Sequence, residues 1–179
     1  MIKKILLLLA AVIAVILVVA AFRPTHFSIQ RSTAIAAPAA LVYAQVNNLH
    51  TWQDFSPWTK LDPNAKISYA GPVEGTGAVF AWSGNSDVGE GKMTITESRP
   101  AEAVRFRLDF VKPMEGTSNV EFAFKQAGGQ TTVTWTMSGE NNYLARIMCL
   151  FMNMDKMVGG QFEQGLASLK TLSEAAVKK

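Results

Sequence analysis

Chemically reactive side chains are scarce in this chain of 179 residues. A single cysteine, Cys149, excludes an internal disulfide and any metal site built from several cysteines. The two histidines, His26 and His50, have no partners at the spacing that a catalytic zinc or a nucleophilic triad requires. The sequence therefore predicts no metal site, no cofactor and no catalytic residue.

Clustered charge is also lacking. Charged residues make up 17% of the chain and the net charge is +3, but lysines and arginines are scattered rather than gathered in a basic stripe. Nucleic-acid binding needs clustered cations, because these displace the counterions of the phosphates. Nucleic acid is therefore excluded as a partner, and the sequence identifies no protein partner.

A long apolar run stands at the start of the chain. Every residue from Ile5 to Phe22 is apolar, after a leader that contains Lys3 and Lys4 and before Arg23-Pro24. As a helix, this run would reach about 27 Å, close to the hydrocarbon thickness of a bilayer. We therefore predict a transmembrane anchor in residues 1–24, with membrane contact through residues 5–22.

A cleaved signal peptide is the alternative interpretation of this run. Apolar regions of signal peptides are usually about 7–15 residues long, shorter than this one. Small residues at Val18–Ala20 or Val19–Ala21 could nevertheless form a cleavage site. Under both interpretations Lys3 and Lys4 favour the cytoplasmic side. The expected location is a single-pass membrane protein whose C-terminal domain is extracytoplasmic, either periplasmic or extracellular.

Most of the remaining chain has the period of a β-strand. Apolar and polar side chains alternate between about Lys66 and Met137, most clearly in 104–110, 120–124 and 133–137. Glycine and proline turn signals separate these segments, and an earlier strand begins at Phe27. The pattern predicts an antiparallel meander with one apolar face and one solvated face.

Helical spacing appears before and after these strands. One short helix is predicted from Pro38 to about Leu49. Apolar stripes from Leu144 to Leu172 predict one long helix that covers the sheet, with a kink or a close sheet contact at Gly159-Gly160. Strands and helices segregated in this way indicate a single α+β domain in residues 25–179.

Four short segments of this domain, taken in their order along the chain, are typical of a known family. They are Ile35-Ala36-Ala37-Pro38, Trp52 to Trp58, Glu90 to Ile95 and Met137 to Asn142. The ordered set resembles the SRPBCC superfamily with its START-like helix-grip fold, and within it the polyketide cyclase/dehydrase-like proteins. The resemblance implies a curved antiparallel sheet wrapped around a long C-terminal helix, with a hydrophobic cavity between them. Members bind lipids, sterols and polyketides, and only some catalyse.

The residues expected to line that cavity are large apolar or aromatic side chains of the inner face and of the helices. They are Trp52, Phe55, Trp58, Tyr69, Phe80, Trp82, Met93, Phe106, Leu108, Phe110, Phe122, Trp135, Met148, Met152 and Phe162.

The leading hypothesis for function is binding, and potentially transfer, of a hydrophobic small molecule or lipid by a membrane-anchored domain. A polyketide cyclase or dehydratase is one alternative, with Tyr69 or a carboxylate at the cavity edge as acid or base. A structural component of an envelope complex, with the cavity collapsed, is another.

Overall fold

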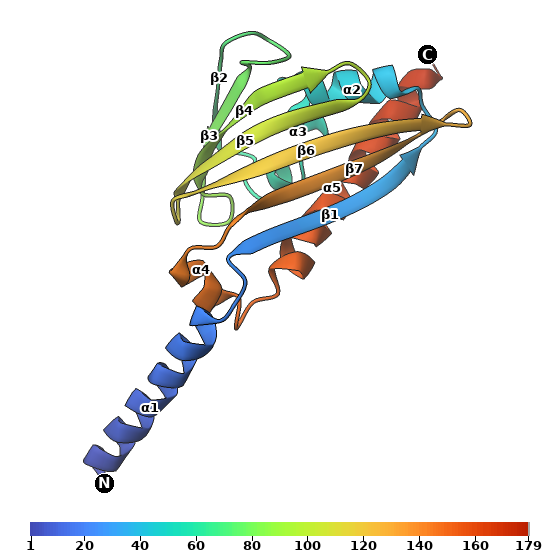
Figure 1. Ribbon diagram of the computed structural model, residues 1–179. Helices are drawn as coiled ribbons and strands as arrows, with labels where there is room; N and C mark the ends of the chain where they lie inside the picture. The colour runs from blue at the N-terminus through green and yellow to red at the C-terminus, as the bar shows by residue number, and fades with distance from the viewer. Residues whose placement is uncertain (179) are drawn as a thin grey trace.

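The computed structural model describes residues 1–178 as one apolar helix followed by an α+β domain (Figure 1). The elements in chain order are α1 (Ile2–Ala21), β1 (His26–Ile35), α2 (Ala39–Asn47), α3 (Trp52–Phe55), the 3-10 helix η1 (Pro57–Lys60), β2 (Lys66–Ala70), β3 (Val79–Ser83), β4 (Glu90–Arg99), β5 (Ala103–Lys112), β6 (Gly116–Ala127), β7 (Gln130–Glu140), α4 (Tyr143–Met148) and α5 (Met154–Val177).

The seven strands form one antiparallel sheet in the order β1-β7-β6-β5-β4-β3-β2. The strands β2 to β7 follow one another as a meander, and β1 returns to pair with β7. Two bulges interrupt the pairing of β4 with β5, with Val111 as the extra residue on β5 and Thr96 as the extra residue on β4. At such sites a strand bends and the local twist increases. The sheet curves around α5, so the predicted α+β helix-grip fold is confirmed (Figure 1).

The predicted alternation decides which face of the sheet is buried. In β6, Val120, Phe122 and Phe124 are buried, whereas Asn119, which directly precedes Val120, points outward and is exposed. Successive strand residues point to opposite faces, so this spacing gathers the apolar side chains on the concave face. That face forms the core together with α2, α3 and α5.

The helix α1 projects away from the domain as a separate rod (Figure 1). Nearly all of its side chains are exposed, and Ala20 in its last turn is the one that is buried. Within the described residues, α1 is the one helix that is long and apolar enough to cross a membrane. A membrane anchor and a signal sequence both fit this description.

The prediction of one long helix after the sheet is wrong. Helix α4 ends at Met148, and α5 begins only at Met154, where the Asn153 side chain accepts a hydrogen bond from the backbone N–H of Lys156. Asparagine is a favoured N-cap residue, so this contact starts a new helix. Of these two helices, α5 lies against the sheet, mainly along β1, while α4 lies beside α1.

A salt-bridge cluster holds the start of α5 against the edge strand β1. The Arg31 guanidinium donates to Asp155 at 3.0 Å and to Glu163 at 2.7 Å. These hydrogen bonds raise the pKa of Arg31, and the bond from Arg31 lowers the pKa of Asp155. Gly159 packs directly over the guanidinium, which confirms a close sheet contact there.

The adjacent glycines give a matched test of this contact. A Cβ at Gly159 would overlap the Arg31 guanidinium, whereas a Cβ at Gly160 meets no atom within 4 Å. We expect Gly160→Ala to stabilise the fold by about 0.5–1 kcal/mol through helix propensity. Gly159→Ala should lack this gain, because the Arg31 guanidinium would have to move away from its hydrogen bonds with Asp155 and Glu163. Urea unfolding of the full chain in detergent micelles measures both variants, and equal stabilities would contradict the contact.

Candidate ligand-binding site

An aromatic cluster fills the centre of the space between the sheet and α5. The Trp135 ring of β7 stacks on Phe162 of α5 at 4.2 Å between centroids and lies 4.5 Å from Phe122 of β6. Trp52 contacts the Phe122 and Trp135 rings edge-on. The members of the cluster are Trp52, Phe55, Trp58, Phe106, Phe122, Trp135 and Phe162. All except the half-buried Trp58 are buried, so seven of the predicted site residues come together as packed core.

A second group of predicted residues lies over strands β2 to β5. Tyr69, Phe80 and Trp82 follow one another at centroid distances of 5.7 and 5.9 Å, and Phe110 meets Trp82 at 6.1 Å. The Trp82 indole N–H donates to the carbonyl of Val88 at 3.0 Å, which fixes its ring. This group is more exposed than the central cluster, because Trp82 and Phe110 are half-buried and Tyr69 is exposed.

The strand register joins part of this group into one line across the concave face. Opposed pairs lead from β1 to β2 through every strand in turn. The line consists of Phe27, Gly139, Ser118, Leu108, Met93, Phe80 and Tyr69, and we call it the inner row. Four of the predicted site residues, Tyr69, Phe80, Met93 and Leu108, are neighbours in it.

Burial changes along the strands at the inner row. In β5, Phe106 is 1% exposed, whereas the next two inward residues, Leu108 and Phe110, are half-buried. In β1, Ile29 is 4% exposed and Phe27, toward α1, is half-buried. The apolar concave face is therefore closed at its centre and partly accessible toward α1.

Small residues occupy the second and third positions of the inner row, counted from Phe27. Gly139 and Ser118 stand opposite each other, with the Phe27 ring on one side and Leu108 on the other. A Cβ at Gly139 would approach the Phe27 ring at 3.0 Å. Because Gly139 and Ser118 are small, the inner face has no large side chain between Phe27 and Leu108. Ser118 adds a hydroxyl group at this position. Sequence analysis did not identify Phe27, Ser118 or Gly139 as site residues, because cross-strand register is needed to align them.

The remaining two predicted residues lie elsewhere. Met148 is half-buried at the end of α4, and Met152 is exposed in the linker that follows it. Neither belongs to the helix that covers the sheet. A hollow of about 410 Å³ is lined by this linker, from Cys149 to Met154.

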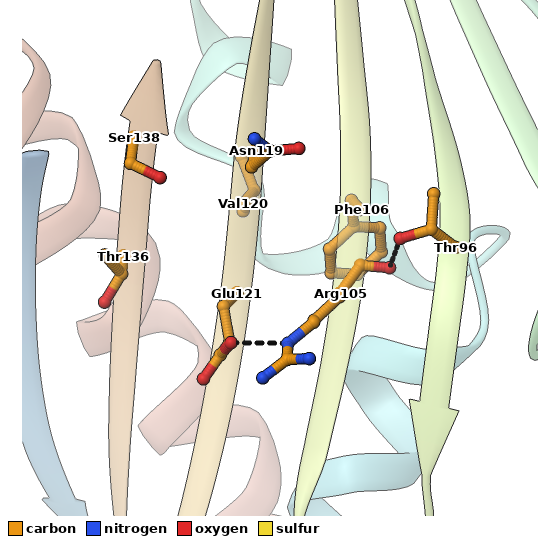
Figure 2. A pocket seen from close by; sticks show the side chains of 8 residues that line it. All are labelled: Thr96, Arg105, Phe106, Asn119, Val120, Glu121, Thr136 and Ser138. Carbon is orange, nitrogen blue, oxygen red and sulfur yellow. Dashed lines mark hydrogen bonds and ion pairs between the residues drawn. The ribbon is translucent and has the colours of Figure 1, made fainter. Parts of the chain in front are cut away.

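Another hollow, of about 270 Å³, opens on the convex face of the sheet (Figure 2). The Arg105 guanidinium crosses it and donates to Glu121 and to Glu97, each at 2.6 Å, and the Thr96 hydroxyl donates to the Arg105 carbonyl at 3.2 Å. The two carboxylates raise the pKa of Arg105, with Glu121 the larger cause. Six of its eight lining residues are polar, and the charges of Arg105 and Glu121 are paired, so this hollow is unlike the apolar site that the sequence predicts.

Titratable groups contribute little to the inner face. Tyr69 is the residue named above for acid or base chemistry, and its ring stacks on His50 at 3.9 Å. Burial, followed by the charge of Asp54, raises the pKa of Tyr69, so the phenol stays protonated at neutral pH. Among the described residues, no group of three or more His, Cys, Asp or Glu side chains could hold a metal ion. The Trp135 indole N–H is buried without a hydrogen-bond acceptor among the same residues.

Sequence comparison identifies the domain. The family model described as "Polyketide cyclase / dehydrase and lipid transport" matches residues 26–174. The chain belongs to this family. A comparison with curated proteins gives no significant match.

Solved structures of low sequence identity share the fold. The Aha1 dimer from Colwellia psychrerythraea is similar with 18% identity and a TM-score of 0.60, over 83% of this chain and 96% of that one. Major latex-like protein 151 from Panax ginseng gives 11% identity and a TM-score of 0.60, over 84% and 99%. The di-domain ARO/CYC StfQ of the steffimycin biosynthetic pathway gives 8% identity and a TM-score of 0.61, over 87% of this chain and 53% of that one.

Proposed function

We propose that this family member binds a hydrophobic small molecule or lipid against the inner row, while α1 anchors it in a membrane. The observation that carries the proposal is the accessible part of the apolar concave face, at Phe27, Leu108 and Phe110, on the side of the domain where α1 leaves it. A ligand there would gain about 25 cal/mol for each Å² of apolar surface removed from water. Apolar sites of this kind need few polar groups, and Ser118 supplies one hydroxyl.

The proposed division of the chain follows from the same features. Residues 1–24 form the anchor and residues 25–179 the binding domain, of which residue 179 lies outside the described part. Lys3 and Lys4 precede the apolar run, and positive residues favour the cytoplasmic side. The binding domain is therefore extracytoplasmic in this proposal. The central aromatic cluster is not the proposed binding site, because its rings already contact one another.

A structural role in an envelope complex is the second candidate. It is favoured by the packed central cluster, since a domain that only supports partners needs a filled core rather than a ligand. The two functions differ in what the inner row contacts in the native membrane. Under the structural role, nothing apolar and specific remains bound to the purified protein.

The experiment is identification of the molecules that co-purify with the full-length protein from its native membrane, by mass spectrometry. Leu108→Lys places a charge in the inner row, whereas Val111→Lys places it on the same strand at a residue that has no partner on β4 and is 47% exposed. We expect a defined apolar molecule with the wild type and with Val111→Lys. Leu108→Lys should lower its amount at least about tenfold, equivalent to about 1.4 kcal/mol.

Circular dichroism of both lysine variants shows whether they are folded. Equal amounts of the molecule in both folded variants would place it away from the inner row. A preparation of the wild type that holds only the bulk lipids of the membrane would contradict stable binding.

A further inference from the structure

The segment from Tyr143 to Met157 exposes an unusual amount of apolar surface. Half of the large apolar side chains that are exposed beyond residue 22 lie within it. Phe151 is 71% exposed, Leu144 54% and Met157 50%, and Met152 and Met154 are exposed as well. Single exposed apolar residues are common, but contiguous ones mark an interaction surface. We call Leu144, Phe151, Met152, Met154 and Met157 the apolar collar.

One end of this segment is fixed to α1. The Tyr143 hydroxyl donates to the carbonyl of Leu17 at 2.7 Å, and the Arg146 guanidinium donates to the carbonyl of Ala21 at 3.2 Å. Both acceptors belong to the end of the apolar helix. Figure 1 shows α4 beside this end of α1, below the sheet. The collar therefore begins at the level where α1 would leave a bilayer.

The other end of the segment is fixed to the domain. Asp155 accepts hydrogen bonds from Arg31 of β1, and Asn153 caps α5. The linker between α4 and α5 is thus held at both sides. The apolar side chains of the linker are exposed in this arrangement, whereas the apolar side chains of the domain core are buried.

Charge distinguishes a lipid surface from other occupants. Asp155 is the only acidic residue between Tyr143 and Met157, and Arg31 neutralises it. Arg146 and Lys156 leave the segment cationic, which suits the anionic headgroups of a membrane. Tyrosine and arginine beside an apolar helix end are also typical of the membrane interface.

We propose that the apolar collar inserts into the interface of the bilayer that α1 spans and seats the domain on it. The collar and the accessible side of the inner row lie at the same end of the domain. Insertion of the collar would therefore hold the proposed ligand-binding site next to the bilayer. This inference rests on the proposed membrane anchor. It adds a second membrane contact, with the lipid bilayer itself as the partner of residues 143–157.

Depth-dependent fluorescence quenching of the full-length protein in liposomes tests this contact. The lone cysteine is removed by Cys149→Ser, and single labels are then attached at Phe151→Cys, Val73→Cys and Val12→Cys. Phe151 lies in the collar, Val73 is 59% exposed in the β2–β3 connection, and Val12 is in the middle of α1. The liposomes contain phosphatidylcholine and phosphatidylglycerol, with bromine atoms at known depths on the acyl chains.

Chain-brominated lipid should quench the labels at Phe151→Cys and Val12→Cys but not the one at Val73→Cys. Quenching at Phe151→Cys should be strongest with bromines near the headgroups, since interfacial segments insert about 5–10 Å into the headgroup and acyl boundary. Quenching at Val12→Cys alone would overturn the collar while keeping the anchor. Absence of quenching at both positions would overturn the anchor and the collar together.

Discussion

Replacing Trp135 with alanine is expected to lower the free energy of unfolding by about 3–5 kcal/mol. The Trp135 ring is 2% exposed and lies against Phe162, Phe122, Trp52 and Trp58. Its removal would leave a cavity at the point where α5 meets the sheet, and packed neighbours relax only partly into such a space. Urea unfolding of the full chain in detergent micelles, followed by far-ultraviolet circular dichroism, measures the loss.

Val73→Ala is the control for this change. It also removes an apolar side chain, but one that is 59% exposed in the β2–β3 connection. We expect its free energy of unfolding in micelles to lie within about 0.5 kcal/mol of the wild type. Equal losses for the two variants would show that the central cluster does not hold the helix to the sheet.

Two charges in α1 are expected to remove the protein from the membrane. An aspartate at the centre of a membrane-spanning helix costs about 2.5–3.5 kcal/mol on insertion scales, so Val12→Asp with Val15→Asp costs about 5–7 kcal/mol. Both side chains are exposed on α1. Carbonate extraction of membranes should leave the wild type in the pellet and deplete the double variant from it.

The mass of the wild-type protein separates the two interpretations of α1. A retained anchor keeps the intact chain in the carbonate-resistant pellet. A protein of reduced mass in the soluble fraction, cut near Ala20 or Ala21, would show that the segment is a signal peptide and contradict the anchor.

The sheet could be predicted from the sequence because its signal is local. Alternation in 104–110, 120–124 and 133–137 assigns each side chain to a face without knowledge of the partner strand. The structure buries Val104, Phe106, Val120, Phe122, Phe124, Val133 and Trp135 as that pattern requires. Strand neighbours could then be inferred from the turn signals between consecutive segments, and the family resemblance added the curvature around the last helix.

Apolar periodicity could not predict the structure of the segment that follows the sheet. The stripe that includes Leu144, Phe151 and Met152 has helical spacing, but such a stripe looks the same whether it packs on a sheet or faces a membrane. The break before α5 depends on the Asn153 cap, which is a single side-chain contact. Apolar spacing continued through this position, so one long helix was predicted where the chain forms two.

The inner row depends on pairing between strands. Gly139 and Ser118 are unremarkable in the sequence, and they matter because register sets them opposite each other between Phe27 and Leu108. Composition also could not show whether the aromatic side chains line a cavity or fill the core. Trp52, Phe106 and Phe122 were predicted to line a cavity, and they instead contact one another in the packed centre.

Photo-crosslinking in the native membrane tests the proposed binding site most directly. A benzophenone-bearing amino acid would replace Leu108 in the inner row and, in separate chains, the exposed Val111 of the same strand and Val12 in α1. After illumination, mass spectrometry of the purified protein identifies the adducts. We predict a defined apolar adduct at position 108, none at position 111 and a mixture of bulk lipids at position 12. No adduct at position 108, or the same bulk mixture as at position 12, would contradict a specific ligand at the inner row.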